Sequence, residues 1–507
     1  MESLKEKTAK GLFWGGMNNG VQQLLGLAFG IILGRLLDPS DYGMTAMLAV
    51  FSVIANELQS SGFKTGLINL EKPQHEDYNA VFWFNILAGS AIYVILWFSA
   101  PLIADFYDQP ALIPLSRYVF LGFVFSSFGI AQSAYLTKQM QIKQIAQCGM
   151  TATLSSSIMG VVLAALGFGY WALATQYLMY IAVNTLLLWY FSPWRPTLLR
   201  FTVYSLRFTV YEPLKRLFPF SVRIMISAIL TQVNGNIMNL LLGRFYGEAN
   251  TGHYNQAYQW SSKCFLLVGN MLKQVDQTVL VGLHDERERQ LAVLRKMMRL
   301  TAFISFPLLF GLGLVSHEFI ILAIKAKWAF AASLLPILCV CGAFMPLSAL
   351  LTDAVISQKR SDIYLWSTLA LGLLQIVLMV GLWQQGIRTM VVAYTLLNIV
   401  WVFVWHFFVR RLMGYRLLHF LKDILPFALA AAFVMSVTWI ITEFTVYSFF
   451  ASSGGIAGVQ FTDDYLRLWV LLISRVVIST ILYYAVMRLA GAVILKECMG
   501  FIKNYRI

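Results

Sequence analysis

Long apolar runs recur along almost the whole chain, and each is long enough to cross a bilayer as a helix of ~17–25 residues. Fourteen such runs can be marked: 11–37, 42–63, 79–104, 113–137, 146–168, 170–192, 218–246, 253–283, 299–323, 332–357, 363–384, 388–409, 425–447 and 467–490. The segments between them are short. The pattern therefore predicts an all-α polytopic membrane protein with about fourteen transmembrane helices.

Four of these runs are less apolar than the others and carry a polar, amide-rich face. They are 11–37, 42–63, 218–246 and 253–283. Polar side chains inside a membrane helix usually face the interior of the bundle or a water-filled cavity. The pattern thus predicts that these four helices surround a polar interior.

Composition and charge support a membrane protein. Of the 507 residues, 59% are apolar and only 12% are charged, which excludes a soluble enzyme and a disordered chain. The net charge of +14 does not indicate nucleic acid, because most Lys and Arg fall in alternate connections on the N-terminal side. The opposite loops hold only Lys325, Lys327 and Arg388. We expect both termini to be cytoplasmic.

Two segments repeat at a constant offset of 209 residues. The end of the first run reads LGRLLDPSDYG (33–43), and the end of the seventh reads LGRFYGEANTG (242–252). Gln23 and Gly26 also match Gln232 and Gly235 at this offset. Six predicted helices separate the two copies, so both have the same orientation in the bilayer, as in parallel transporter repeats.

The repeat predicts two six-helix lobes and a final helix pair. We place the N-lobe at 1–192, the C-lobe at 218–411, and the last two helices with a cytoplasmic tail at 412–507. The basic segment 193–217, which contains RFTVY twice, is expected to be an amphipathic connector on the cytoplasmic surface. Alternating access by rocking of the two lobes is the expected mechanism.

Several of these motifs resemble a known family. The segment 33–43, together with GFKTGLI (62–68), YNQAYQW (254–260), RLTAFISFPLLFGL (299–312) and KW (327–328), is similar to Wzx-type polysaccharide and lipopolysaccharide (O-antigen) flippases. The similarity is to the colanic-acid-exporter-like branch of the multidrug/oligosaccharidyl-lipid/polysaccharide flippase superfamily. The chain has Gln256 where the family often has Arg, which removes one contact to an anion.

The resemblance implies a MATE-like fold in the bacterial inner membrane. It also implies a substrate, an oligosaccharide linked to undecaprenyl pyrophosphate, that is moved across the membrane for surface polysaccharide synthesis. A polysaccharide polymerase and chain-length proteins are implied as partners, and no cofactor is expected. A pyrophosphate needs cations in a low-dielectric site, whereas sugars need amide, hydroxyl and aromatic partners.

The polar residues inside the apolar runs supply candidates for each part of this substrate. The candidate pyrophosphate ligands are Lys263, Arg475, Arg35, Arg244 and Arg223. The candidate sugar-facing residues are Asn19, Gln23, Gln232, Asn236, Tyr258 and Trp260. Glu57 and Asp276 are candidates for ion coupling, although Asp276 lies three residues after Lys273 and could simply pair with it. Snorkelling or helix–helix pairing would also explain most of the cations.

Two other functions remain open on the sequence. One is a cation-coupled antiporter of drugs or small solutes with the same fold. The other is a membrane-embedded polymerase or ligase of the same pathway, but the longest outside loop, about 448–466, is short for a catalytic loop. No phosphate-binding loop for ATP and no zinc-ligand spacing is found in the sequence.

Overall fold

The computed structural model describes residues 4–60, 63–197, 212–282, 286–358, 360–452 and 460–489. Side chains are described for residues 14–59, 64–197, 226, 228–271, 286–358, 360–445 and 465–489. These residues form helices joined by short turns, and no strand occurs among them. The chain is therefore an all-α membrane protein, and it divides into two compact units, Met1–Gly252 and His253–Ile507.

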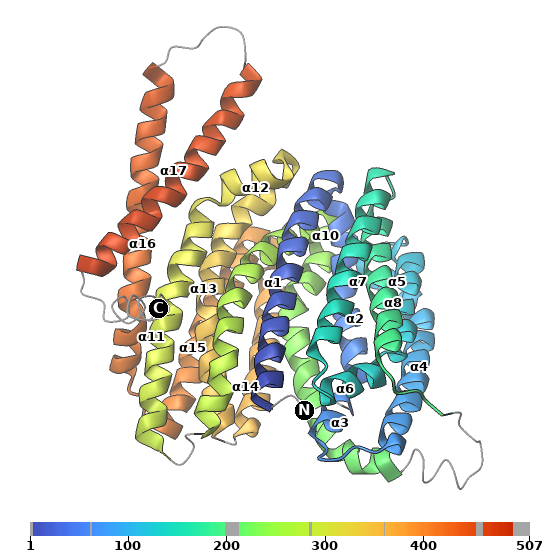
Figure 1. The fold of residues 1–507 in the computed structure, drawn as a ribbon. Coiled ribbons are helices and arrows are strands. Elements are labelled where there is room, and N and C mark those ends of the chain that lie inside the picture. Colours follow the sequence, from blue (N-terminus) through green and yellow to red (C-terminus); the bar gives the residue numbers. More distant parts are fainter. Residues whose placement is uncertain are drawn as a thin grey trace. The chain divides into compact units, whose positions relative to one another are not determined.

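Figure 1 shows the helices of the first unit, which overlap the predicted runs but differ from them in their ends. They are α1 (Leu4–Leu36), α2 (Pro39–Ser60), α3 (Phe63–Asn69), α4 (His75–Tyr107), α5 (Leu112–Ser127), α6 (Ile130–Lys138), α7 (Ile142–Ala165), α8 (Tyr170–Phe191) and the first part of α10 (Glu212–Gly282). The predicted run 113–137 is not one straight helix, because α5 and α6 meet at a bend of 43°.

Helix α10 unites two predicted runs, 218–246 and 253–283. The chain stays helical through the expected turn, except at Gly247, where φ is 77° and ψ is −176°. Residues with a side chain almost never adopt this backbone conformation, whereas glycine does so readily. A single glycine therefore replaces the predicted six-residue turn and separates an N-terminal arm from a C-terminal arm.

The described part of the second unit contains the C-terminal arm of α10 and nine further helical segments. These are α11 (Arg287–Leu314), α12 (Ser316–Ile324), η2 (Ala326–Trp328), α13 (Ala329–Ser357), α14 (Ser361–Leu382), η3 (Trp383–Gln385), α15 (Ile387–Met413), α16 (Leu417–Ser452) and, after the undescribed residues, α17 (Gln460–Leu489). The predicted run 299–323 is interrupted at Val315, between α11 and α12. In Figure 1, α16 and α17 cross each other and project beyond the other helices of this unit.

The number of membrane spans is supported only in part. In the described part of the chain, nine helices are long and apolar enough to cross a bilayer, or ten if the bent pair α5–α6 is one span. The other four predicted spans are the less apolar ones, which correspond to α1, α2 and the two arms of α10. The total of fourteen stays a prediction, as does the division into lobes at 1–192 and 218–411.

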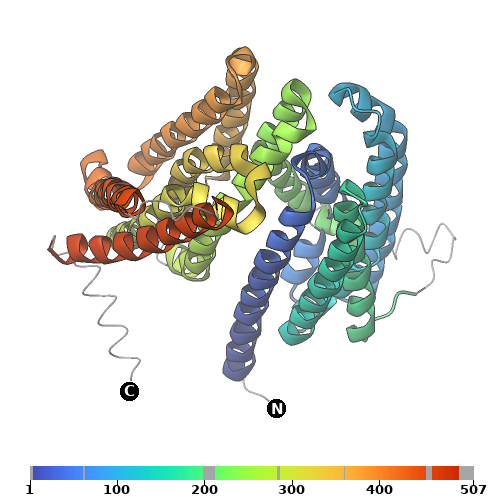
Figure 2. The same cartoon turned by 90° about the horizontal axis from the view of Figure 1, so that it is seen from above.

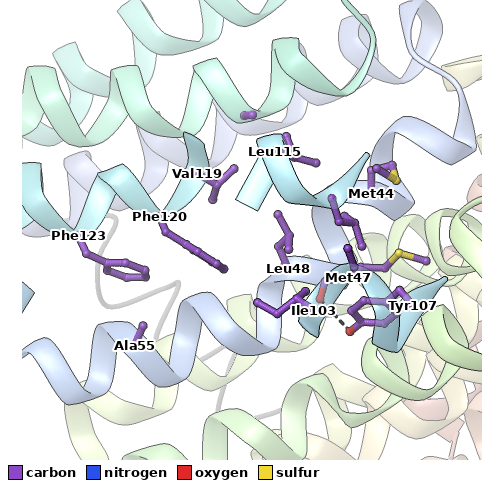
Figure 3. Close-up of a cluster of buried hydrophobic side chains, with 13 residues drawn as sticks. Met44, Met47, Leu48, Ala55, Ile103, Tyr107, Leu115, Val119, Phe120 and Phe123 are labelled. Atoms are coloured by element: carbon purple, nitrogen blue, oxygen red, sulfur yellow. Dashed lines mark hydrogen bonds between the residues drawn. The ribbon is translucent and has the colours of Figure 1, made fainter. Parts of the chain in front are cut away.

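A buried apolar cluster holds α2, α4, α5 and α8 together in the first unit. Met47 and Leu48 of α2 pack with Ile103 and Tyr107 of α4 and with Phe120 of α5 (Figure 3). The Tyr107 hydroxyl donates to the carbonyl of Met47 at 2.9 Å, which satisfies the one polar group that this cluster buries from α4. Helix α1 lies against the other side of this unit, alongside α7 (Figure 2).

The start of the predicted connector is packed against α4. Trp194 is buried, and its Nε1 donates to Nδ1 of His75 at 3.1 Å. The backbone N–H of Thr197 donates to the Asn79 side chain at 3.0 Å, and its carbonyl accepts from Trp83 at 3.0 Å. These bonds show that the first residues of 193–217 are part of the folded unit. Residues 198–211, including both RFTVY copies, lie outside the described residues.

An ion pair joins α11 to α16 in the second unit. Arg295 contacts both carboxylate oxygens of Asp423, at 2.7 and 3.2 Å, and the Tyr415 hydroxyl donates to Asp423 at 2.9 Å. Asp423 is only 3% exposed, so its charge requires these partners. This network connects the last helix pair to the rest of the unit.

Candidate functional site

The two copies of the sequence repeat have matching environments in the structure. Leu33 and Leu242 are both buried, and so are Gly34 and Gly243. Arg35 and Arg244 are both exposed, as are Gln23 and Gln232. Positions related by the offset of 209 therefore occupy equivalent places on their helices, as a structural duplication requires.

The repeats also contact each other through paired glycines, all within residues 1–252. A Cβ on Gly43 would lie 1.7 Å from the backbone oxygen of Glu248, and a Cβ on Gly252 would lie 1.8 Å from that of Pro39. Glu248 is 209 residues after Pro39, just as Gly252 is 209 residues after Gly43. The two contacts thus exchange under the repeat, which is the pattern of a two-fold interface. Only glycine permits so close an approach.

The structure brings Glu57 and Gln232 together. Gln232 Nε2 on the N-terminal arm of α10 donates to Glu57 Oε1 on α2 at 3.4 Å. Asn236, one turn later on α10, donates to the backbone carbonyl of Gln232 at 2.9 Å. An ion-coupling candidate and two sugar-facing candidates therefore form one polar group in the first unit.

The amides of α1 separate into two sets. Gln22 donates to Asn18 at 2.8 Å, and a Cβ on Gly149 of α7 would lie 2.5 Å from Gln22 Nε2. Gln22 therefore faces α7 and contributes to helix packing. Asn19 and Gln23 are exposed and keep their polar groups accessible. Of the two sets, only Asn19 and Gln23 are exposed, whereas Asn18 and Gln22 are partly buried.

Arg244 contacts the end of a helix. Its Nη1 donates to the carbonyl of Phe106 at 2.7 Å, and its guanidinium lies 5.6 Å from the centroid of the Phe106 ring. Phe106 is in the last turn of α4, where carbonyls have no partner within the helix and a cation is favourable. This contact gives Arg244 a structural role. Arg35, its repeat partner, is exposed.

The aromatic candidates on the C-terminal arm of α10 have different environments. Trp260 is 4% exposed and packs edge-on against Phe319 of α12, with centroids 4.9 Å apart. Tyr258 is partly buried and stacks on Tyr254 at 6.0 Å. Lys263 is partly buried, with its Nζ 4.4 Å from the centroid of the Trp260 ring, a cation–π geometry. Trp260 thus holds the Lys263 ammonium in place rather than presenting a sugar platform.

Arg475 lies in a buried charge network in the second unit. Its guanidinium donates to Glu318 Oε1 at 2.7 Å, to Glu443 Oε2 at 2.9 Å and to Thr442 Oγ1 at 3.2 Å. Two carboxylates therefore already compensate its charge. This geometry agrees with the alternative of pairing between the last two helices, and it leaves Arg475 little capacity for a pyrophosphate.

Sequence reasoning missed Glu318. The residue is 4% exposed and pairs with an arginine 157 positions away, so no local spacing indicates the partner. The one available signal is an acidic residue at the start of the apolar segment EFIILAI. The side chains of Arg223 and Asp276, two of the predicted site residues, lie outside the described residues.

These groups can form hydrogen bonds and ion pairs with a polar ligand. No cluster of His, Cys, Asp or Glu able to hold a metal ion occurs in the described residues. The candidate residues provide hydrogen-bonding amides, carboxylates and cations on the helices of a mostly apolar protein. Such groups bind and release a polar ligand within a membrane.

Comparison with known proteins identifies the family. A family model described as polysaccharide biosynthesis protein matches residues 32–333, which is more than half of the chain. The chain belongs to this family. The matched range includes the repeat segments 33–43 and 242–252, which make the Gly43–Glu248 and Gly252–Pro39 contacts, and it includes Lys263. The chain is also similar to proteins named for the biosynthesis of lipopolysaccharide and teichuronic acid.

Two such relatives are the lipopolysaccharide biosynthesis protein WzxC of Escherichia coli and the teichuronic acid biosynthesis protein TuaB of Bacillus subtilis. WzxC is 26% identical over 71% of this chain and 72% of its own length. TuaB is 24% identical over 85% of this chain and 88% of its own length. These relatives are similar over most of the chain at modest identity, whereas the family membership rests on the family model.

Solved structures show the same fold. The lipid II flippase MurJ in its inward closed conformation matches 94% of this chain and 99% of its own, with a TM-score of 0.68 at 14% identity. An inward-facing MATE-family multidrug resistance transporter matches 78% of this chain and 94% of its own, with a TM-score of 0.63 at 16% identity. The predicted MATE-like fold is confirmed.

Proposed function

We propose that this protein moves a lipid-linked oligosaccharide, an undecaprenyl-pyrophosphate-linked repeat unit, across the bacterial inner membrane by alternating access. The observation that carries the proposal is membership of a polysaccharide-biosynthesis family by a chain with a transporter fold. A polymerase or ligase would need a catalytic group, which the described side chains do not assemble. A drug antiporter shares the fold, but its function would not explain the family match.

The duplicated glycine contact supports an alternating mechanism. Two equivalent helix starts meet through Gly43 and Gly252, so the contact can open and close symmetrically. The exposed amides Asn19 and Gln23 and the Glu57–Gln232 pair are suited to sugar hydroxyls, and Lys263 to the pyrophosphate. The membrane potential supplies ~2.3 kcal/mol per 100 mV for each charge that moves outward with the substrate.

The proposal can be tested in vesicles that contain lipid-linked oligosaccharide in both leaflets. An impermeant glycosidase added outside trims only sugars in the outer leaflet. Vesicles with the protein should reach complete trimming, whereas protein-free vesicles should stop at about half. A stop at half with correctly inserted protein would overturn the proposal. A labelled cationic drug in the same vesicles would reveal antiport instead.

Topology is the first prediction. We propose that both termini are cytoplasmic, because the basic connections lie on that side. Reporter fusions are expected to place 193–217 and 284–298 inside and 448–466 outside. An external position for 193–217 would contradict the fourteen-helix arrangement.

A polysaccharide polymerase and chain-length proteins are proposed as partners.

The second prediction concerns Lys263. Lys263→Ala is expected to abolish export while the protein still accumulates in the membrane, because the pyrophosphate loses its cation. Lys263→Arg should retain part of the activity, since the charge persists although its shape differs. Polysaccharide at the cell surface and protein in the membrane fraction are measured together. Normal export by Lys263→Ala would remove this residue from the site.

The third prediction concerns Glu57. Glu57→Gln is expected to slow flipping severalfold without abolishing it, because an amide can still bond to Gln232. Flipping should persist under an imposed membrane potential with no pH or sodium gradient. If Glu57→Gln is inactive and only a pH gradient drives flipping, Glu57 is the coupling residue and the membrane potential is not the driving force.

A further inference from the structure

A cavity of about 470 Å³ lies between α12, α16 and α17 in the second unit. Its lining combines charged, aromatic and apolar side chains: His317, Glu318, Ile321, Glu443, Tyr465, Arg467, Leu468 and Leu471. None of the residues proposed above to bind the exported substrate lines this cavity. Arg475 does not line it either, but it pairs with two residues that do, Glu318 and Glu443. The cavity therefore requires an explanation of its own.

One carboxylate oxygen in the wall has no donor. Glu318 is 4% exposed, and its Oε1 accepts from Arg475, but its Oε2 has no hydrogen-bond partner among the described residues. A buried carboxylate oxygen without a donor costs free energy of about 1–3 kcal/mol or more. Arg475 makes no bond to this oxygen: its Nη1 also donates to the carbonyl of Leu314, and its Nη2 and Nε donate to Glu443 and Thr442. A ligand with an N–H group would satisfy Glu318.

Arg467 lines the same cavity, and its guanidinium is accessible to an anionic group. Arg467 is 43% exposed, and among the described side chains it pairs with Glu443 at 3.9 Å, a contact too long for a good hydrogen bond. Among the described side chains, Arg467, Arg475, Glu318 and Glu443 sum to zero charge. The unsatisfied acceptor is on Glu318, whereas the accessible guanidinium is that of Arg467. This distribution favours a zwitterion over a simple anion or cation.

The cavity is lined by the two helices of the last pair, which turn lipid-sized apolar side chains outward. Its α16 residue is Glu443, and its α17 residues lie between Tyr465 and Leu471. Beside it on α17, Leu466, Trp469 and Ile473 are 50–57% exposed. Large apolar side chains exposed on a membrane helix face lipid, and Trp and Tyr are enriched towards its interface with water. A membrane lipid can therefore reach the cavity with its headgroup.

We propose that this cavity binds the headgroup of a phospholipid with a primary ammonium and a phosphate, of the phosphatidylethanolamine type. The ammonium donates to Glu318 Oε2, and the phosphate accepts from Arg467. A primary ammonium has three N–H donors, whereas a choline headgroup of the same charge has none. The site thereby discriminates between two zwitterionic lipids by hydrogen bonding.

Lipid retention by the purified full-length protein tests the proposal without any transport measurement. The protein is washed in detergent containing equal phosphatidylethanolamine and phosphatidylcholine, and bound lipid is counted by native mass spectrometry. We expect about a tenfold preference for phosphatidylethanolamine, the difference that one charge-assisted hydrogen bond supplies. Equal retention of the two lipids would overturn the proposal.

Variants separate the two halves of the site. Glu318→Gln should remove the preference between the lipids, and Arg467→Gln should lower the retention of both, because it removes the phosphate partner while leaving the buried ion pair intact. Arg388→Gln is the matched control, an exposed arginine at the start of α15 in the same unit, and should retain the preference. Unchanged retention in Arg467→Gln would refute the assignment even if Glu318→Gln does not fold.

The source of the headgroup is tested by competition. Soluble phosphoethanolamine carries the same ammonium and phosphate but no acyl chains. It should displace bound phosphatidylethanolamine only at far higher concentrations, because the apolar face of α17 holds the chains. Displacement at equal concentrations would show that a free solute, and not a membrane lipid, is the ligand.

Discussion

Gly43→Ala is expected to reduce export about tenfold or more. The added Cβ would lie 1.7 Å from the backbone oxygen of Glu248, so α2 and α10 must separate by more than 1 Å at their point of contact. Overpacking of this kind costs about 1–3 kcal/mol, and each 1.4 kcal/mol is a factor of ten in a rate or an equilibrium. Backbone atoms cannot rotate away as a flexible side chain can. The contact would then fail to re-form in each transport cycle.

The repeat itself provides the comparison variants. Gly252→Ala should have the same effect as Gly43→Ala, because its Cβ would lie 1.8 Å from the backbone oxygen of Pro39. Gly26→Ala and Gly235→Ala form an equally spaced repeat pair with nothing within 4 Å of the added carbon, and should export normally. Surface polysaccharide is measured against protein abundance in the membrane. Normal export by Gly43→Ala would exclude the glycine contact from the cycle.

Arg475→Met is expected to produce the largest loss of stability, about 3–5 kcal/mol, because it leaves the buried carboxylate of Glu318 without its cation. Both side chains of this pair are only 5% exposed, whereas Glu443 is 45% exposed and can be solvated. A thiol-reactive dye can follow unfolding in detergent, since Cys148, Cys339 and Cys341 are buried. The Tm of Arg475→Met should fall markedly.

Two further variants make the Arg475 prediction specific. Arg475→Met combined with Glu318→Met should recover much of the lost stability, because two apolar side chains replace a buried pair with little net cost. Arg289→Met removes an exposed ion pair of the same 2.7 Å length, with Glu286, and should shift the Tm little. Equal shifts for Arg475→Met and Arg289→Met would contradict a stabilising role for burial of the pair.

Most of the fold could be predicted from the sequence. Apolar runs of sufficient length predict the membrane helices, because a bilayer leaves the backbone no partner outside the helix. The offset of 209 also identifies the duplication, and most of its paired positions, such as Leu33 and Leu242 or Arg35 and Arg244, have the same burial in the structure. Helix boundaries were less accurate, as the bend between α5 and α6 and the continuity of α10 show.

The candidate site depended far more on tertiary structure. Spacing on one helix could group Asn18 with Gln22 and Asn19 with Gln23, but only the packing against Gly149 showed which pair is used for helix contact. The partner of Arg475 is 157 residues away on another helix, and a helical period carries no information about such a distance. A sequence pattern reports which face of a helix is polar, since that follows from 3.6 residues per turn. Which polar group meets which is decided by how the helices pack.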